Sequence, residues 1–260
     1  MWFDTTLSMK RVVSELCNKV NWKLSTLFRA SKLFDIPGLV IQFKARILGY
    51  IEYRTPAIYH ADATVLKQVD SLFEKFIRGI GLTKEDALKD YSLAPLSSRR
   101  DIAMLGVIHR AVLGKGPEQI RNFFPPEPKS MHEHGRNSLR RHKLQLQSYR
   151  QGRFLERTGN SVLGLVDVYN LLPSEVVEIE DVHNFQSALQ GLLKVHAKNG
   201  NLRWEDLFSP RLDLHNHPLR RILNATTSVY DGVWEDCNVT DATIAQTGAN
   251  GSNDRPPAWW

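Results

Sequence analysis

The feature that most constrains the fold is a helical spacing of apolar residues, three and four positions apart, which recurs over most of the chain. It is clearest between Leu7 and Ala30, where the apolar residues of one face are Met9, Val13, Leu16, Val20, Leu24, Leu27 and Phe28. This spacing is typical of a long amphipathic helix with one buried face. A chain patterned in this way buries its apolar residues by packing helices together, so we expect a mainly α fold.

Residues that favour helix starts divide the first half of the chain into further helices. We expect starts at Asp35, before Pro37, and at Asp62, Thr83 and Pro117. The expected buried face of the second helix is Leu39, Phe43, Ile47 and Ile51, and that of the third is Val65, Leu66, Val69, Leu72, Phe73, Phe76 and Ile77. Another helix, capped near Asp181, is expected to run toward Gly200.

The segment Leu93–Gly114 carries a complete set of helix boundary features. Ser98 and Asp101 have the spacing of a capping box, and Gly114 is placed as a C-terminal stop. Arg99 and Arg100 oppose the helix dipole at this start. They would serve either to bind phosphate or to pair with a core-facing acid such as Glu52, and we favour the salt bridge.

A basic block lies in the second half of the chain. Residues 129–157 contain eight Lys or Arg residues against two Glu residues, and they follow the proline-rich break at residues 125–128. Leu144 and Leu146 alternate with polar neighbours, as in a short strand. We therefore expect a helical region at 1–124, a small basic α+β or irregular module at 125–200 and a poorly ordered tail at 201–260.

Composition and cysteine content bear on the compartment. The formal net charge of +6 is a mild lean toward polyanionic partners. Cys17 and Cys237 lie far apart in the sequence, and neither a secretory signal nor a run of 18 apolar residues is present. We expect an intracellular protein, nuclear or cytoplasmic, without a membrane partner.

Histidine pairs give little support for a metal site. His132 and His134, like His215 and His217, lack nearby third and fourth ligands, so we interpret both pairs as surface residues. His109 lies within an expected helix, and we interpret it as a packed or capping histidine.

Several blocks resemble, in the expected order, the region that follows the polymerase core in reverse transcriptases of non-LTR (LINE-type) retrotransposons. Agreement covers residues 3–200, and no single block is specific by itself. Besides the segment Leu93–Gly114, the blocks are Phe3-Asp4-x-x-Leu7, Trp22-Lys23-Leu24, Glu52-Tyr53-Arg54-Thr55-Pro56-Ala57, Arg140-Arg141-His142, Tyr169-Asn170-Leu171-Leu172-Pro173, and Phe185 with Leu189.

The resemblance implies a thumb-like helical region followed by a segment that contacts the RNA/DNA template–primer. In that interpretation basic side chains neutralise phosphates, while Tyr149 and Phe154 stack on unpaired bases. The implied contact residues are Arg136, Arg140, Arg141, Lys143, Tyr149, Arg150, Arg153, Phe154 and Arg157. The alternative is that the basic block is simply a solvated surface.

The sequence departs from the family at the catalytic residues. Reverse transcriptases hold two divalent metals, usually Mg²⁺, between palm carboxylates in a tetrapeptide ending in Asp-Asp, and this sequence has no Asp-Asp pair. The resemblance begins after the palm, so the palm and fingers would be a partner module. We expect neither catalytic residues nor a cofactor in this chain, and no metal site. The alternative is a helical protein-interaction module, or an element remnant without a function.

Overall fold

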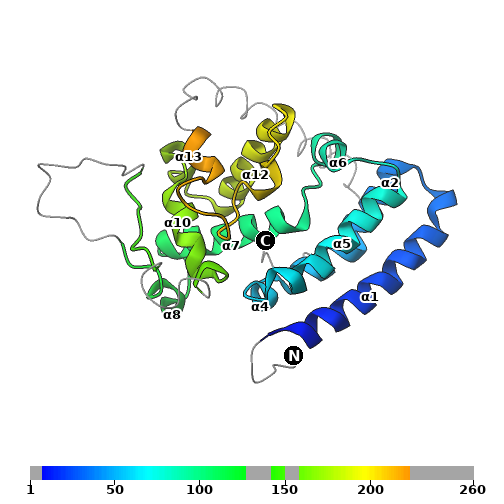
Figure 1. Ribbon diagram of the computed structural model, residues 1–260, viewed down its shortest axis with the longest axis horizontal. Coiled ribbons are helices and arrows are strands. Elements are labelled where there is room, and N and C mark those ends of the chain that lie inside the picture. Colours follow the sequence, from blue (N-terminus) through cyan, green and yellow to red (C-terminus); the bar gives the residue numbers. More distant parts are fainter. Residues whose placement is uncertain (1–7, 127–141, 150–157, 223–260) are drawn as a thin grey trace, which may run out of the picture.

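The computed structural model describes residues 8–126, 142–149 and 158–222, and it is mainly helical as expected (Figure 1). No described helix combines the length and the apolar character needed to cross a membrane. In the N-terminal half the elements are α1 (Lys10–Arg29), η1 (Ser31–Leu33), α2 (Ile36–Phe43), the π-helical η2 (Lys44–Leu48), α3 (Gly49–Glu52), α4 (Thr55–Ile58), α5 (Ala63–Gly79) and α6 (Lys84–Tyr91).

The remaining elements form the other side of the molecule. They are α7 (Leu96–Val112), α8 (Glu118–Arg121), η3 (Val162–Gly164), α10 (Leu165–Asn170), α11 (Ser174–Val177), α12 (Val182–Lys198), η4 (Trp204–Asp206) and α13 (Pro218–Ile222). Figure 1 shows α7 crossing the middle of the molecule, with α1 and α5 side by side at one end and α10 and α12 at the other.

The helix starts in the N-terminal half largely match the sequence. The side chains of Asp35 and Thr83 accept hydrogen bonds from the amides of Gly38 and Asp86, as caps of α2 and α6. Asp62 occupies the cap position of α5 but makes no cap hydrogen bond through its side chain. All seven residues expected on the buried face of α5, and all four on that of the second helix, are buried.

Two hydrophobic clusters make up the core. The N-terminal cluster joins α1, α2, η2, α3 and α5, and Phe43 stacks on Phe76 at its centre, with ring centroids 4.0 Å apart. The C-terminal cluster joins α7, α10, α11 and α12. Helix α7 lies within the region 1–124 of the sequence, yet most of its buried side chains, such as Leu105 and Ile108, belong to the C-terminal cluster. The core is therefore not divided at residue 124.

The capping box predicted at Ser98 and Asp101 is not formed. Helix α7 begins at Leu96, so its cap position is Pro95, three residues before Ser98. The Ser98 hydroxyl donates to the backbone oxygen of Glu205 (2.7 Å), and the Asp101 carboxylate accepts from the Tyr59 hydroxyl (2.7 Å). Partners from distant parts of the chain occupy both side chains, so neither caps the helix.

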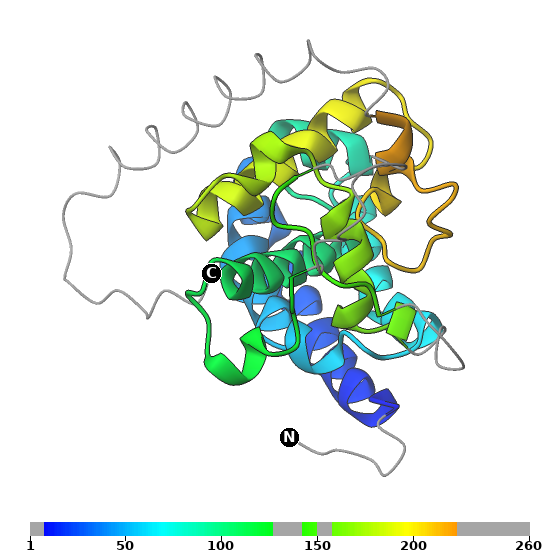
Figure 2. The same cartoon turned by 90° about the vertical axis from the view of Figure 1, so that its left-hand side faces the viewer.

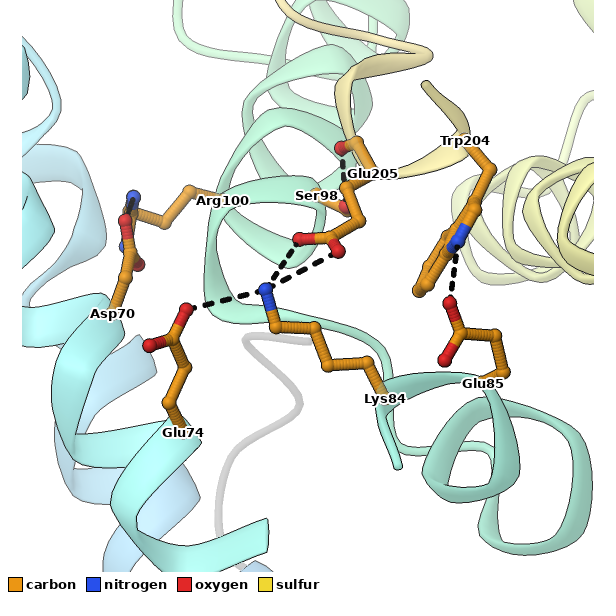
Figure 3. Close-up of polar contacts among 8 residues, drawn as sticks. All are labelled: Asp70, Glu74, Lys84, Glu85, Ser98, Arg100, Trp204 and Glu205. Carbon is orange, nitrogen blue, oxygen red and sulfur yellow. Dashed lines mark hydrogen bonds and ion pairs between the residues drawn. The ribbon is translucent and has the colours of Figure 1, made fainter. Parts of the chain in front are cut away.

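The segment that contacts Ser98 was assigned by the sequence to the tail. Residues 201–222 instead pack on the core through Trp204, Leu207, Phe208 and Leu219, all buried. Figure 3 shows the polar contacts that hold η4 in place: Lys84 lies between Glu74 (3.2 Å) and Glu205 (2.9 Å), and the Trp204 indole donates to Glu85 (3.3 Å). An ordered structure thus continues to residue 222, and residues 223–260 lie outside the described part.

No β-strand is present in the described residues. Leu146, expected in a short strand, makes one isolated antiparallel bridge to Pro126. Its amide donates to the Asn170 side chain (2.9 Å), and its carbonyl accepts from the same side chain (2.8 Å). An amide side chain, rather than a neighbouring strand, satisfies both backbone groups of Leu146, so no ladder develops.

Candidate nucleic-acid interface

Most of the site residues implied by the sequence lie outside the described part of the chain. These are Arg136, Arg140, Arg141, Arg150, Arg153, Phe154 and Arg157. Lys143 is described and exposed. Tyr149 is half-buried, packs against the C-terminal cluster and donates its hydroxyl to the backbone oxygen of Phe123 (2.9 Å). Contact of these residues with nucleic acid stays a prediction.

The described part of the basic block, residues 142–149, is fixed to the core. His142 is buried, with one ring nitrogen 3.0 Å from the backbone oxygen of Tyr169 and its ring edge-on to the Tyr169 ring. Together with the bonds between Asn170 and Leu146, this contact attaches residues 142–149 to α10. The block Tyr169–Pro173, quoted above for its resemblance, therefore has a structural role in this chain.

A groove between α1 and the helix formed by α2, η2 and α3 combines aromatic and basic side chains. Its volume is about 880 Å³, and its lining includes three cations and no carboxylate. We call it the aromatic–basic groove, and the side chains that define it are Trp22, Lys23, Arg46, Tyr50, Tyr53 and Arg54.

The rings of this groove are open to solvent. Trp22 on α1 is 68% exposed and Tyr53, just after α3, is 77% exposed. Phe34, which also lines the groove, is 42% exposed. Large exposed apolar side chains gathered in one place mark an interaction surface more often than singly scattered ones do.

The cations of the groove are held around Tyr50. The Lys23 ammonium donates to the backbone oxygen of Arg46 (3.0 Å) and lies 4.6 Å from the centroid of the Tyr50 ring. The Arg54 guanidinium lies 3.9 Å from the same centroid and donates to the Tyr50 backbone oxygen (3.1 Å). Among the described residues, Lys23, Arg46 and Arg54 form no salt bridge. Their charges are thus available to an anionic ligand.

The π-helical segment η2 presents Arg46 to the groove. Ile47, also on η2, is buried in the N-terminal cluster. Lys44, at the start of the segment, donates to the backbone oxygen of Tyr91 at 2.5 Å, which ties η2 to the end of α6. Burial lowers the pKa of Lys44, and the positive charges of Arg99 and Lys194 lower it further. Widened helical turns of this kind often occur at functional sites.

The expected salt bridge at the start of α7 is confirmed. The Arg99 guanidinium pairs with the Glu52 carboxylate, which removes Arg99 as a phosphate-binding candidate. The adjacent Arg100 forms a two-bond pair with Asp70 (2.6 and 2.9 Å). Both arginines are therefore used to join α7 to the N-terminal cluster.

The histidines divide between core and surface. His109 is packed as expected: its ring nitrogens lie 3.0 Å from the Tyr169 hydroxyl and 2.6 Å from the backbone oxygen of Ile179, and burial lowers its pKa. His215 is exposed, whereas the prediction that His217 lies on the surface is wrong. His217 is buried, and hydrogen bonds to the backbone of Ser209 (3.1 Å) and of Leu219 (3.3 Å) satisfy both of its ring nitrogens.

No group of three or more His, Cys, Asp or Glu residues that could hold a metal ion is found in the described residues. His132 and His134 lie outside them.

The aromatic–basic groove was not identified as a site from the sequence. Trp22 and Tyr53 lie off the predicted buried faces, and their position beside basic residues was the available clue. Their convergence requires α1 to pack against α2, η2 and α3, which the periodicity does not specify. Comparison with known proteins adds no further assignment: no family model, curated protein or solved structure gave a significant match to the chain.

Proposed function

We propose that this chain binds nucleic acid through the aromatic–basic groove. In this proposal it is the non-catalytic, thumb-like part of a non-LTR reverse transcriptase and helps to hold the template–primer. The observation that carries the proposal is the combination, in one groove, of three cations in no described salt bridge, exposed rings and no lining carboxylate. Cations neutralise phosphates, and ring faces accept stacked bases.

The link to the reverse transcriptase family is supported by the meeting of two of the resembling blocks in one groove. Two of the blocks that carry the resemblance, Trp22-Lys23-Leu24 and Glu52–Ala57, are separated by about thirty residues in sequence. Trp22 and Lys23 from the first block line the same groove as Tyr53 and Arg54 from the second. A shared ligand would account for both blocks at once.

The basic block is a second part of the proposal. Its described segment, residues 142–149, packs on the C-terminal cluster through Leu146 and Tyr149. This segment lies away from α1, toward the other end of the molecule (Figure 1). Contacts from both regions would hold a nucleic acid at two separated places. Charge reversal at Arg140, Arg141 and Arg150 tests this second contact independently of the groove.

The salt dependence of binding tests the proposed function. Arg46→Glu and Lys23→Glu should each weaken binding of a primed RNA–DNA template. They should also reduce the slope of log K against log salt by about one, because each removes one phosphate contact. Fluorescence anisotropy titrations at several salt concentrations measure both quantities. Lys67→Glu, an exposed reversal on α5 outside the groove, is the matched control.

Equal affinities and equal salt slopes for all three variants and the unchanged chain would contradict binding through the groove. The chain alone should also incorporate no nucleotide on a primed RNA template with Mg²⁺, since it has no Asp-Asp pair. Measurable incorporation would contradict the non-catalytic role.

A further inference from the structure

We propose that the aromatic–basic groove holds an unpaired stretch of nucleic acid rather than a duplex. Bases would stack on Trp22 and Tyr53, and phosphates would lie at Lys23, Arg46 and Arg54. This inference rests on the proposed function and narrows its ligand to a single strand.

The chemistry of the rings favours unpaired bases. Trp22 and Tyr53 are the two most exposed aromatic side chains in the described residues, at 68% and 77%. In a double helix the faces of the bases are covered by their neighbours, so exposed rings find no stacking partner along its length. Unpaired bases offer both faces and stack on such rings with little sequence preference.

The placement of the cations suits the backbone of such a strand. Lys23 and Arg54 both lie over the Tyr50 ring, and each is fixed by a backbone carbonyl. The exposed rings of Trp22 and Tyr53 line the same groove, so ring faces and cations are close together. A single strand likewise places a phosphate beside each base. Fixed cations lose little side-chain entropy when a phosphate binds.

The groove has the volume of a ligand site and adjoins a second groove. A volume of about 880 Å³ is within the range of roughly 300–1,000 Å³ that is typical of small-ligand pockets. A second groove of about 570 Å³ adjoins it, sharing Tyr50, Tyr53 and Arg54. It adds Lys19 and also Glu15, whose carboxylate pairs with Arg11 (3.3 Å). The two grooves are continuous through these shared residues, so a strand that occupies the first can extend into the second.

The test compares two labelled ligands on the full chain. One is an oligouridylate of about twelve nucleotides, within the site sizes of single-strand-binding proteins, and the other is a blunt RNA–DNA duplex of equal length. Fluorescence anisotropy gives both affinities. We expect the oligouridylate to bind more tightly than the duplex. Trp22→Ala and Tyr53→Ala should each weaken oligouridylate binding about 5-fold to 100-fold and change duplex binding by less than about 2-fold.

Three further variants control the experiment. Trp22→Phe keeps a stacking ring and should retain most of the affinity, whereas Trp22→Leu keeps only apolar area and should behave as Trp22→Ala does. Phe123→Ala removes an exposed ring (58%) that does not line the groove and should leave oligouridylate binding unchanged. Because Trp22 is largely exposed, these chains should fold, and their circular dichroism melting curves verify this.

The outcomes separate the two proposals. Equal binding of the two ligands, or an equal effect of Trp22→Ala on both, would overturn the single-strand inference and leave nucleic-acid binding in place. No binding of either ligand at low salt would overturn both. If, in addition, an apolar helical peptide bound to the unchanged chain and to Trp22→Leu but not to Trp22→Ala, the occupant of the groove would be a protein.

Discussion

At the scale of single residues, Asp101 is a buried carboxyl whose pKa is strongly shifted. It is buried beneath Tyr59 and accepts a hydrogen bond from the Tyr59 hydroxyl (2.7 Å). Burial raises its pKa to about 7, although the Tyr59 hydrogen bond and the charges of Arg100 and Arg211 oppose the rise, and the charge of Asp70 adds to it. In the folded protein this carboxyl therefore binds a proton far more readily than in the unfolded chain.

The first prediction follows from that difference. Between the ordinary pKa of 3.8 and about 7, the folded state holds more protons than the unfolded state. The contribution of Asp101 to stability is therefore present at low pH and is lost as pH rises, by up to about 1.4 kcal/mol per pH unit. Asp101→Asn, which retains a hydrogen-bond acceptor for Tyr59, should abolish this contribution.

Urea unfolding of the unchanged chain and of Asp101→Asn, from pH 4.5 to 7.5, measures this contribution of Asp101 to stability. Other groups that titrate in this range, such as His109 and His196, are common to both chains, so they cancel in the comparison. An unchanged difference in unfolding free energy between the two chains at every pH would contradict the assignment.

At the scale of elements, the helix from α2 through η2 to α3 has two roles. Its sequence predicts the buried face but not the wall of a groove. Its buried face carries Leu39, Phe43, Ile47 and Ile51, as expected. Its exposed side forms one wall of the aromatic–basic groove, and Gly49 lies there with helical backbone angles (φ −59°) and open space where a Cβ would stand.

The second prediction concerns that glycine. Gly49→Ala should stabilise the protein by about 0.5–1 kcal/mol, because alanine restricts the unfolded chain and favours the helix without a clash. Urea denaturation measures the change. Gly114→Ala is the opposite control: Gly114 follows α7 with φ +72°, a conformation unfavourable to alanine, and the variant should be less stable than the natural chain.

At the scale of the whole molecule, residues 201–222 join the two hydrophobic clusters. Trp204 and Phe208 are buried in the C-terminal cluster, while Glu205 pairs with Lys84 at the start of α6 (Figure 3). The Arg211 guanidinium donates to the backbone oxygens of Tyr59 and Ala61 (3.2 and 3.0 Å), between α4 and α5. Figure 2 shows this segment beside α12, across the molecule from α1.

The third prediction is that the chain cannot be shortened to residue 200. Ending it at Gly200 removes Trp204, Leu207, Phe208 and Leu219. Their burial contributes roughly 1.5–3 kcal/mol each, which is comparable in sum to the whole stability of a typical domain. We expect loss of cooperative thermal unfolding and aggregation in size-exclusion chromatography. A chain ended at Ile222 keeps all four side chains and should unfold cooperatively. Cooperative unfolding of the shorter chain would contradict this role.

The sequence by itself determined the longer helices and their buried faces. Apolar spacing and local caps act over a few residues, so α1, α5 and the caps of α2, α6 and α12 follow from neighbouring residues alone. It also indicated the pairing of Arg99 with an acid such as Glu52. For the candidate site, the sequence identified the blocks that contain Trp22 and Tyr53, but it did not predict that these two residues line the same groove.

Only the tertiary structure decided the features that depend on distant partners. Ser98 and Asp101 bond to Glu205 and Tyr59 instead of capping α7, and Leu146 bonds to a side chain instead of a strand. The apolar side chains of residues 201–222 pack against helices from distant parts of the chain, so no local spacing predicts their burial. The aromatic–basic groove likewise exists only where α1 packs against η2 and α3. The sequence specifies the chemistry of each side chain, whereas the packing of the helices decides which side chains lie close together.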